Sequence, residues 1–219
     1  MRFCIACAVA AMVVWGVVAS PALAQAQPAP PKKGPSREVL NALGDVRSRY
    51  GADAVMIEGF LMGHAIEGGS VLETSVAVAG IEEWQARRYL SFKLDTGIVY
   101  NDHEVAPDAR TGRTWTRIVE RTLRRFRSIN VPADGIEFMI TYTHRAYVEE
   151  PGWRVELNRD HGTAESVAFY LSNSDVADFL AVRITAQQLL DRTTVLVDGV
   201  PKRVVAEPPE PTPTAPESE

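Results

Sequence analysis

The chain has 219 residues and a formal net charge of −5, a balance that gives no general electrostatic basis for binding nucleic acid. Its two cysteines, Cys4 and Cys7, both precede residue 26, so the remainder can form no disulfide and offers no thiolate as nucleophile or zinc ligand. Residues 36–206 are long enough to form a single domain with a sizeable hydrophobic core.

Residues 1–26 have the pattern of a cleaved signal peptide. Arg2 precedes an almost wholly apolar stretch at residues 5–18, and Ala22-Leu23-Ala24 follows Pro21 as a small-residue cleavage site. The alternative is a retained membrane anchor, but the apolar stretch is shorter than the ~20 residues that a spanning helix needs. We therefore expect an exported protein, periplasmic or secreted, without a transmembrane segment after cleavage.

Proline-rich segments flank the predicted domain. Residues 27–35 form a linker that cannot be helical, and residues 207–219 (EPPEPTPTAPESE) combine prolines with carboxylates. This composition predicts a disordered, solvated acidic tail; a spacer or docking tail is the alternative interpretation.

Helix and strand signals alternate in the first half of the domain. Ser36 has the chemistry of an N-cap, and apolar residues at helical spacing run to Tyr50, where Gly51 can end the helix. Strands are predicted at residues 54–62, 71–79 and 87–94. A polar loop then runs from Asp102 to Arg113.

The stretch from Arg113 to Asn130 predicts a strongly two-sided helix. Its apolar arc holds Trp115, Ile118, Val119, Thr122, Leu123, Phe126 and Ile129, and its arginines fall on the opposite side. Six arginines less Glu120 leave a local charge of +5. Arginine suits planar carboxylate and phosphate acceptors, so this side is either a solvated helix face or a docking face.

The second half of the domain is richer in strands. Strands are predicted at residues 136–148, 153–157, 165–171 and 178–184, a helix from Thr185 to Arg192, and a closing hairpin across Asp198-Gly199. The expected fold class is α+β, with one curved antiparallel sheet and about three amphipathic helices on one face.

A sparse repeat accompanies this order of elements. Ala52-Asp53 recurs as Ala133-Asp134, and Tyr89-Leu90-Ser91 recurs as Tyr170-Leu171-Ser172 at the same offset. Self-similarity at a fixed offset is typical of duplication, here of a helix-plus-four-strand unit at residues 36–113 and 114–206. The junction of the two units would form a groove lined by Tyr142, His144, Trp153 and Tyr170.

Motifs for catalysis or cofactors are weak. Asp95-Thr96-Gly97 resembles the active-site triplet of aspartic peptidases, but those enzymes need two triplets or a homodimer, and the sequence favours a tight turn here. The four histidines show no metal-binding spacing, and there is no glycine-rich nucleotide loop or nucleophile elbow. No cofactor or metal is therefore predicted.

The leading hypothesis is an exported, non-catalytic binding protein. Its partner would be an acidic envelope protein, an anionic glycan or lipid headgroups. The residues proposed to bind are Arg117, Arg121, Arg124, Arg125, Tyr142, His144, Trp153 and Tyr170. Two alternatives stay open: a hydrolase that uses the loop from Asp102 to Arg113 with His144 or His161, and a structural assembly subunit.

Overall fold

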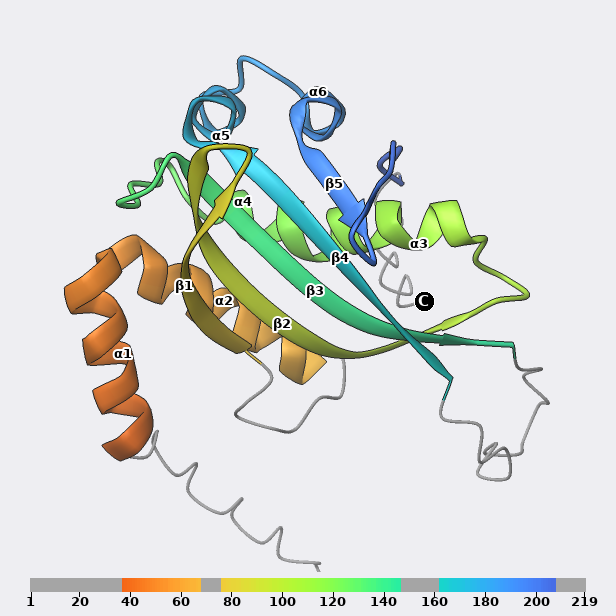
Figure 1. Cartoon of the computed structure of the whole chain (residues 1–219), viewed down its shortest axis with the longest axis horizontal. Helices are drawn as coiled ribbons and strands as arrows, with labels where there is room; N and C mark the ends of the chain where they lie inside the picture. Colours follow the sequence, from red (N-terminus) through yellow and green to blue (C-terminus); the bar gives the residue numbers. More distant parts are fainter. Residues whose placement is uncertain (1–36, 68–75, 147–161, 208–219) are drawn as a thin grey trace, which may run out of the picture. The chain divides into compact units, whose positions relative to one another are not determined.

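The computed structural model describes residues 37–67, 76–146 and 162–207, apart from the side chains of residues 37–40 and 65–67 (Figure 1). Its helices are α1 (Arg37–Tyr50), α2 (Ala52–Glu67), α3 (Pro107–Thr114), η2 (Trp115–Glu120), α4 (Arg121–Leu123), α5 (Asn173–Leu180) and α6 (Ala186–Arg192). Its strands are β1 (Val76–Trp84), β2 (Arg87–Asn101), β3 (Gly135–Arg145), β4 (Thr163–Ser172), β5 (Thr194–Val197) and β6 (Val200–Pro201). The expected α+β class with a curved sheet is confirmed (Figure 1).

The six strands form one sheet in the order in which they occur in the chain. Neighbouring strands are antiparallel except β2 and β3, which are parallel. Parallel neighbours need a long crossover, and α3, η2 and α4 provide it, passing behind the sheet in the view of Figure 1. The sheet is therefore mixed, and the expectation of a wholly antiparallel sheet is wrong at this pair.

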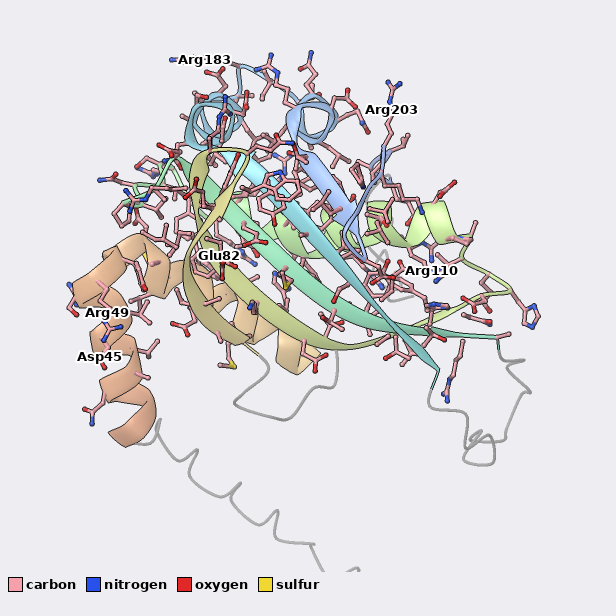
Figure 2. The ribbon with its side chains drawn as sticks, in the orientation of Figure 1. Asp45, Arg49, Glu82, Arg110, Arg183 and Arg203 are labelled. Carbon is pink, nitrogen blue, oxygen red and sulfur yellow. The ribbon has the colours of Figure 1, made fainter. Side chains whose placement is uncertain are left out.

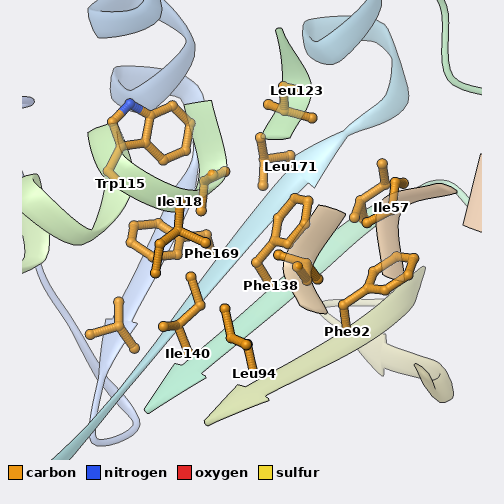
Figure 3. Close-up of a cluster of buried hydrophobic side chains, with 14 of the residues drawn as sticks. Ile57, Phe92, Leu94, Trp115, Ile118, Leu123, Phe138, Ile140, Phe169 and Leu171 are labelled. Atoms are coloured by element: carbon orange, nitrogen blue, oxygen red, sulfur yellow. The ribbon is translucent and has the colours of Figure 1, made fainter. Parts of the chain in front are cut away.

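The core lies between this crossover helix and one face of the sheet. Alternate residues of β3 and β4, such as Phe138, Ile140 and Phe169, are fully buried and point at the helix (Figure 3). The predicted apolar arc is confirmed, because Trp115 and Leu123 are both 0% exposed. The middle of the helix is a π-helix, η2, and the helix ends at Leu123 instead of Asn130.

The predicted strand at residues 54–62 is wrong, because this stretch belongs to α2. Ala54, Ile57 and Leu61 are fully buried at helical spacing, so one face of α2 packs on the core. Gly59 and Gly63 lie on its outer side, where an added Cβ would meet nothing within 4 Å. The glycines that counted against a helix are thus positions without a packing partner.

Three further predictions around the sheet also fail. The expected turn at Asp95-Thr96-Gly97 is an irregularity inside β2, where the register with β3 shifts and Thr96 Oγ1 donates to the carbonyl of Thr141 at 2.9 Å. The expected strand at residues 178–184 is no strand: it begins in the last residues of α5 and continues as a turn, and the N-cap of α5, Ser172, accepts a hydrogen bond from the Asp175 amide at 3.1 Å. The expected polar loop becomes helical at Pro107, in α3.

Several local predictions are confirmed. Gly51 ends α1 with φ 92°, Thr185 caps α6 in a capping box, and Asp198-Gly199 joins β5 to β6 with φ 48° and 80°.

The repeat register would match α2 with β3, a helix with a strand, so these segments are not structural counterparts. The predicted signal peptide, the linker, the strand at 153–157 and residues 208–219 of the tail lie outside the described residues. Within the described part of the chain, no helix has the length and apolar character to span a membrane.

Candidate functional site

Four predicted arginines gather on the outer surface of the crossover helix. Arg117 lies in η2, Arg121 in α4, and Arg124 and Arg125 directly after it; all four are exposed. We call these four residues the arginine face. Their exposure follows from the buried arc on the other side of the same helix, because a helix that packs one face on a sheet presents the opposite face to solvent.

Two hollows adjoin along the arginine face. The larger, of about 580 Å³, is lined by Thr116, Glu120, Arg121, Arg124 and Arg125. The smaller, of about 110 Å³, is lined by Gly59, Phe60, Gly63, His64, Arg121 and Arg125. Because Arg121 and Arg125 line both, the two hollows are adjacent, and we call them together the arginine groove; the smaller one lies between α2 and the crossover helix.

Contacts with neighbouring side chains restrain the arginines of the groove. Arg124 pairs with Glu120 at 2.7 Å and lies over the ring of Phe179 at 5.0 Å. Arg125 lies over the ring of Phe60 at 6.0 Å. Such cation–π contacts orient a guanidinium, and in Arg124 the pair with Glu120 already engages Nε and one terminal nitrogen. The groove is thus a partly preorganised, cationic surface.

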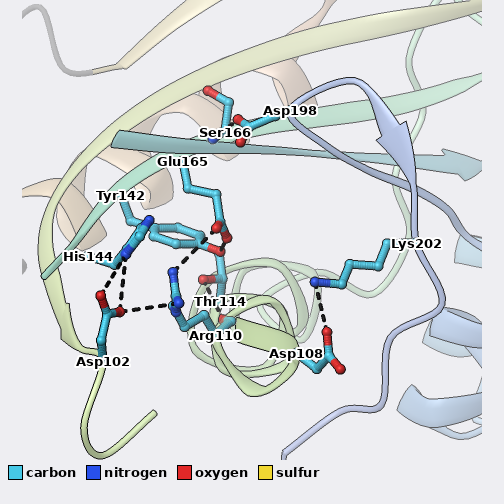
Figure 4. Close-up of polar contacts among 10 residues, drawn as sticks. All are labelled: Asp102, Asp108, Arg110, Thr114, Tyr142, His144, Glu165, Ser166, Asp198 and Lys202. Carbon is cyan, nitrogen blue, oxygen red and sulfur yellow. Dashed lines mark hydrogen bonds and ion pairs between the residues drawn. The ribbon is translucent and has the colours of Figure 1, made fainter. Parts of the chain in front are cut away.

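Tyr142 and His144 belong to a different place, where β2, β3 and β4 meet α3 (Figure 4). The His144 Nδ1 atom is 3.1 Å from Asp102, and the Arg110 guanidinium lies 3.2 Å from Asp102 and 3.4 Å from Glu165. The Tyr142 hydroxyl donates to Glu165. We call these five residues the polar cluster.

The polar cluster is mostly buried and internally paired. The side chain of Arg110 is only 5% exposed, and that of Glu165 13%. Burial, and after it the hydrogen bond to Glu165, raise the pKa of Tyr142 well above its ordinary value. The arrangement ties the segment after β2 to β3 and β4 and so fixes the start of the crossover helix.

The polar cluster bears on the hydrolase alternative. The structure does bring Asp102, from the expected loop, to His144, and a carboxylate that orients an imidazole is half of a general-base arrangement. However, the described residues place no hydroxyl in hydrogen-bond contact with the His144 ring, and among them no three His, Cys, Asp or Glu side chains converge as metal ligands. His161 lies outside the described residues.

Tyr170 lies on the opposite face of the sheet from Tyr142. In the register of β3 with β4, Tyr170 is paired with Glu137, and Tyr142 is paired with Glu165. Glu137 and Tyr142 are five positions apart in β3, and residues an odd number apart in a strand point to opposite faces. Tyr170 stacks on Trp84 at 5.3 Å between ring centroids. Burial and a hydrogen bond to Glu137 raise its pKa. Tyr142, His144 and Tyr170 therefore line no common groove, and Trp153 lies outside the described residues.

Some residues of these sites escaped the sequence interpretation. His64 was missed because the stretch before it, residues 54–62, was predicted to be a strand, whereas His64 lies in the last turn of α2. Arg110 was missed because it lay in an expected solvated loop. Glu165 carried a usable signal, since strand alternation places it on the same face as the buried Val167 and Phe169.

Comparisons with protein-family models, curated proteins and solved structures find no match to this chain.

Proposed function

We propose that this is an exported binding protein that captures an acidic polypeptide segment in the arginine groove. The observation that carries the proposal is the shared lining of the two hollows by Arg121 and Arg125, with His64 also lining the smaller one. An extended segment laid along this groove would meet successive guanidinium groups.

The chemistry of the groove favours carboxylates. Arginine binds a carboxylate through two parallel hydrogen bonds, which are stronger than hydrogen bonds between neutral groups. Among the residues that the structure describes, Glu120 is the only acidic residue that lines either hollow, and its Oε1 atom already accepts from Arg124 Nε at 2.8 Å. The lining therefore offers more positive than negative charge, although the whole chain is acidic.

The first test is direct binding of a fluorescein-labelled decaglutamate to the protein without residues 1–26, followed by fluorescence anisotropy. Arg121→Gln with Arg125→Gln should weaken binding by up to about thirtyfold, because each change removes a charge-assisted pair worth up to about 1 kcal/mol at an exposed site. Binding of the unaltered protein should also weaken steeply with salt.

A matched control distinguishes loss of the groove's arginines from a general loss of positive charge. Arg127→Gln with Arg203→Gln removes the same charge from exposed side chains outside both hollows, and Arg203 projects away from the fold (Figure 2). This variant should bind decaglutamate within about twofold of the unaltered protein, as exposed charges that do not contact the ligand are screened. Equal losses in both double variants would contradict a defined site. Binding of heparin or anionic vesicles with no binding of decaglutamate would contradict the polypeptide class.

A further inference from the structure

A short extended segment of the chain already lies along the crossover helix. Residues 202–207 follow β6, and Lys202 Nζ lies 2.8 Å from Asp108 near the start of α3. Val204 is buried, at 6% exposure. We call residues 202–207 the strap.

The end of the strap is bound by the first arginine of the helix. Glu207 pairs with Arg113 at 2.5 Å, and the Glu207 carbonyl accepts from Thr116 Oγ1 at 2.9 Å. The strap passes so close to the helix that a Cβ on Gly112 would lie 2.2 Å from the Val205 carbonyl oxygen. The helix therefore binds a carboxylate and an extended backbone from this same chain.

The strap runs in the direction of the arginine groove. Its successive contacts are Asp108, Gly112 and Thr116, which advance along the helix toward α4. Thr116 is also part of the lining of the larger hollow. The strap therefore ends beside a residue that lines the arginine groove.

The sequence beyond the strap is suited to this groove. Residues 208–219 contain Glu210, Glu217 and Glu219 among prolines, and carry no Lys or Arg. A proline-rich extended chain advances about 3.1 Å per residue and an α-helix about 1.5 Å. If the chain continued along the helix, Glu210, three residues past Glu207, would be about 9 Å further on, roughly the level of Arg121 five residues past Thr116.

We propose that residues 208–219 occupy the arginine groove, with Glu210 paired to Arg121 or Arg125, and that they compete there with the acidic partner. The competition rests on the proposed function, whereas the docking of the segment does not. The segment also indicates the kind of partner that fits: an extended acidic peptide in which prolines hold the backbone straight.

The test uses the protein without residues 1–26, with Glu210→Gln, Glu217→Gln and Glu219→Gln combined. The first readout needs no ligand: the side-chain Nε–Hε NMR signals of Arg121 and Arg125, assigned through the Arg→Gln variants, should shift relative to the unaltered protein. The second is the affinity for labelled decaglutamate, which should rise by about three- to tenfold, since an internal occupant that fills the site 70–90% of the time lowers the apparent affinity by that factor.

A control triple variant has the same charge change elsewhere. Asp45→Asn, Glu83→Gln and Glu104→Gln replace exposed carboxylates outside the groove and the strap, and should leave both readouts unchanged. Unshifted Arg121 and Arg125 signals in the Glu210/Glu217/Glu219 variant, or equal gains in affinity in the two triple variants, would overturn the proposal. Shifted signals without any binding of decaglutamate would support the docking of the segment while refuting the proposed function.

Discussion

Replacing Arg110 by methionine tests whether the ion pairs of the polar cluster stabilise the fold. Arg110 bridges Asp102 and Glu165 while its own side chain is only 5% exposed. Methionine keeps most of the side-chain volume but removes the charge, and so leaves the Glu165 carboxylate, which is 13% exposed, without its cation. Removing one partner of a buried ion pair costs about 3–5 kcal/mol, because the remaining charge stays desolvated.

The structure places the expected loss at the lower end of that range. Asp102 is 31% exposed and keeps its contact with His144, so it contributes less than Glu165. We expect Arg110→Met to lower the free energy of unfolding by about 3 kcal/mol, or the melting temperature by about 6–12 °C at 2–4 °C per kcal/mol. Urea unfolding followed by tryptophan fluorescence measures this, since Trp115 is fully buried in the core.

Arg183 provides the matched control for this substitution. It pairs with Asp178 at 2.9 Å, a shorter distance than either Arg110 pair, but its side chain is 72% exposed. Arg183→Met should therefore cost less than about 1 kcal/mol. The double variant Arg110→Met with Glu165→Gln should have a free energy of unfolding about 1–3 kcal/mol higher than additivity predicts, because it lacks the buried, unpaired Glu165 carboxylate. Similar losses for Arg110→Met and Arg183→Met, or strict additivity with Glu165→Gln, would refute burial as the cause.

Three further predictions concern stability. Burial and the hydrogen bond to Glu165 raise the folded-state pKa of Tyr142 above 10.0. The contribution of Tyr142 to the free energy of unfolding is therefore complete below pH 10 and is lost as the pH rises further. Tyr142→Phe should accordingly flatten the fall in the free energy of unfolding at alkaline pH, measured by urea titration. Burial likewise raises the pKa of Glu58 above 4.5, so Glu58→Gln should raise the melting temperature at neutral pH, with a gain that vanishes near pH 4. Gly112→Ala should cost about 1–3 kcal/mol and expose the strap to protease, whereas Gly44→Ala, with open space around it in α1, should stabilise by about 0.5–1 kcal/mol.

The apolar arc of the crossover helix could be predicted because its spacing alone separates a buried from a solvated side. Trp115, Ile118 and Leu123 are buried as that spacing requires. Helix α2 could not be predicted in the same way, since apolar Val55, Met56 and Phe60 also fall outside its buried stripe and blur the periodicity. Tertiary packing on β2, not local pattern, decides its structure.

The two candidate sites differ in how far the sequence predicts them. The arginine face follows from one helix, so its residues were predictable, but the groove needs α2 as its second wall and was not. The polar cluster joins residues up to 63 positions apart (Asp102 and Glu165), and only the sheet register brings them together. Such long-range pairing leaves no local signal in a single sequence.

The π-helix at the centre of the crossover helix links the two roles of its arginines. In a regular α-helix, Arg113, Arg117 and Arg121 would form one stripe at four-residue spacing. The wider turn of η2, with its i→i+5 bonds, shifts the residues after it around the axis. Arg113 accordingly binds the strap through Glu207, while Arg121 lies beside His64 on α2. The same helix thus pairs one arginine with a carboxylate of its own chain and, one π-turn further on, turns Arg121 toward α2.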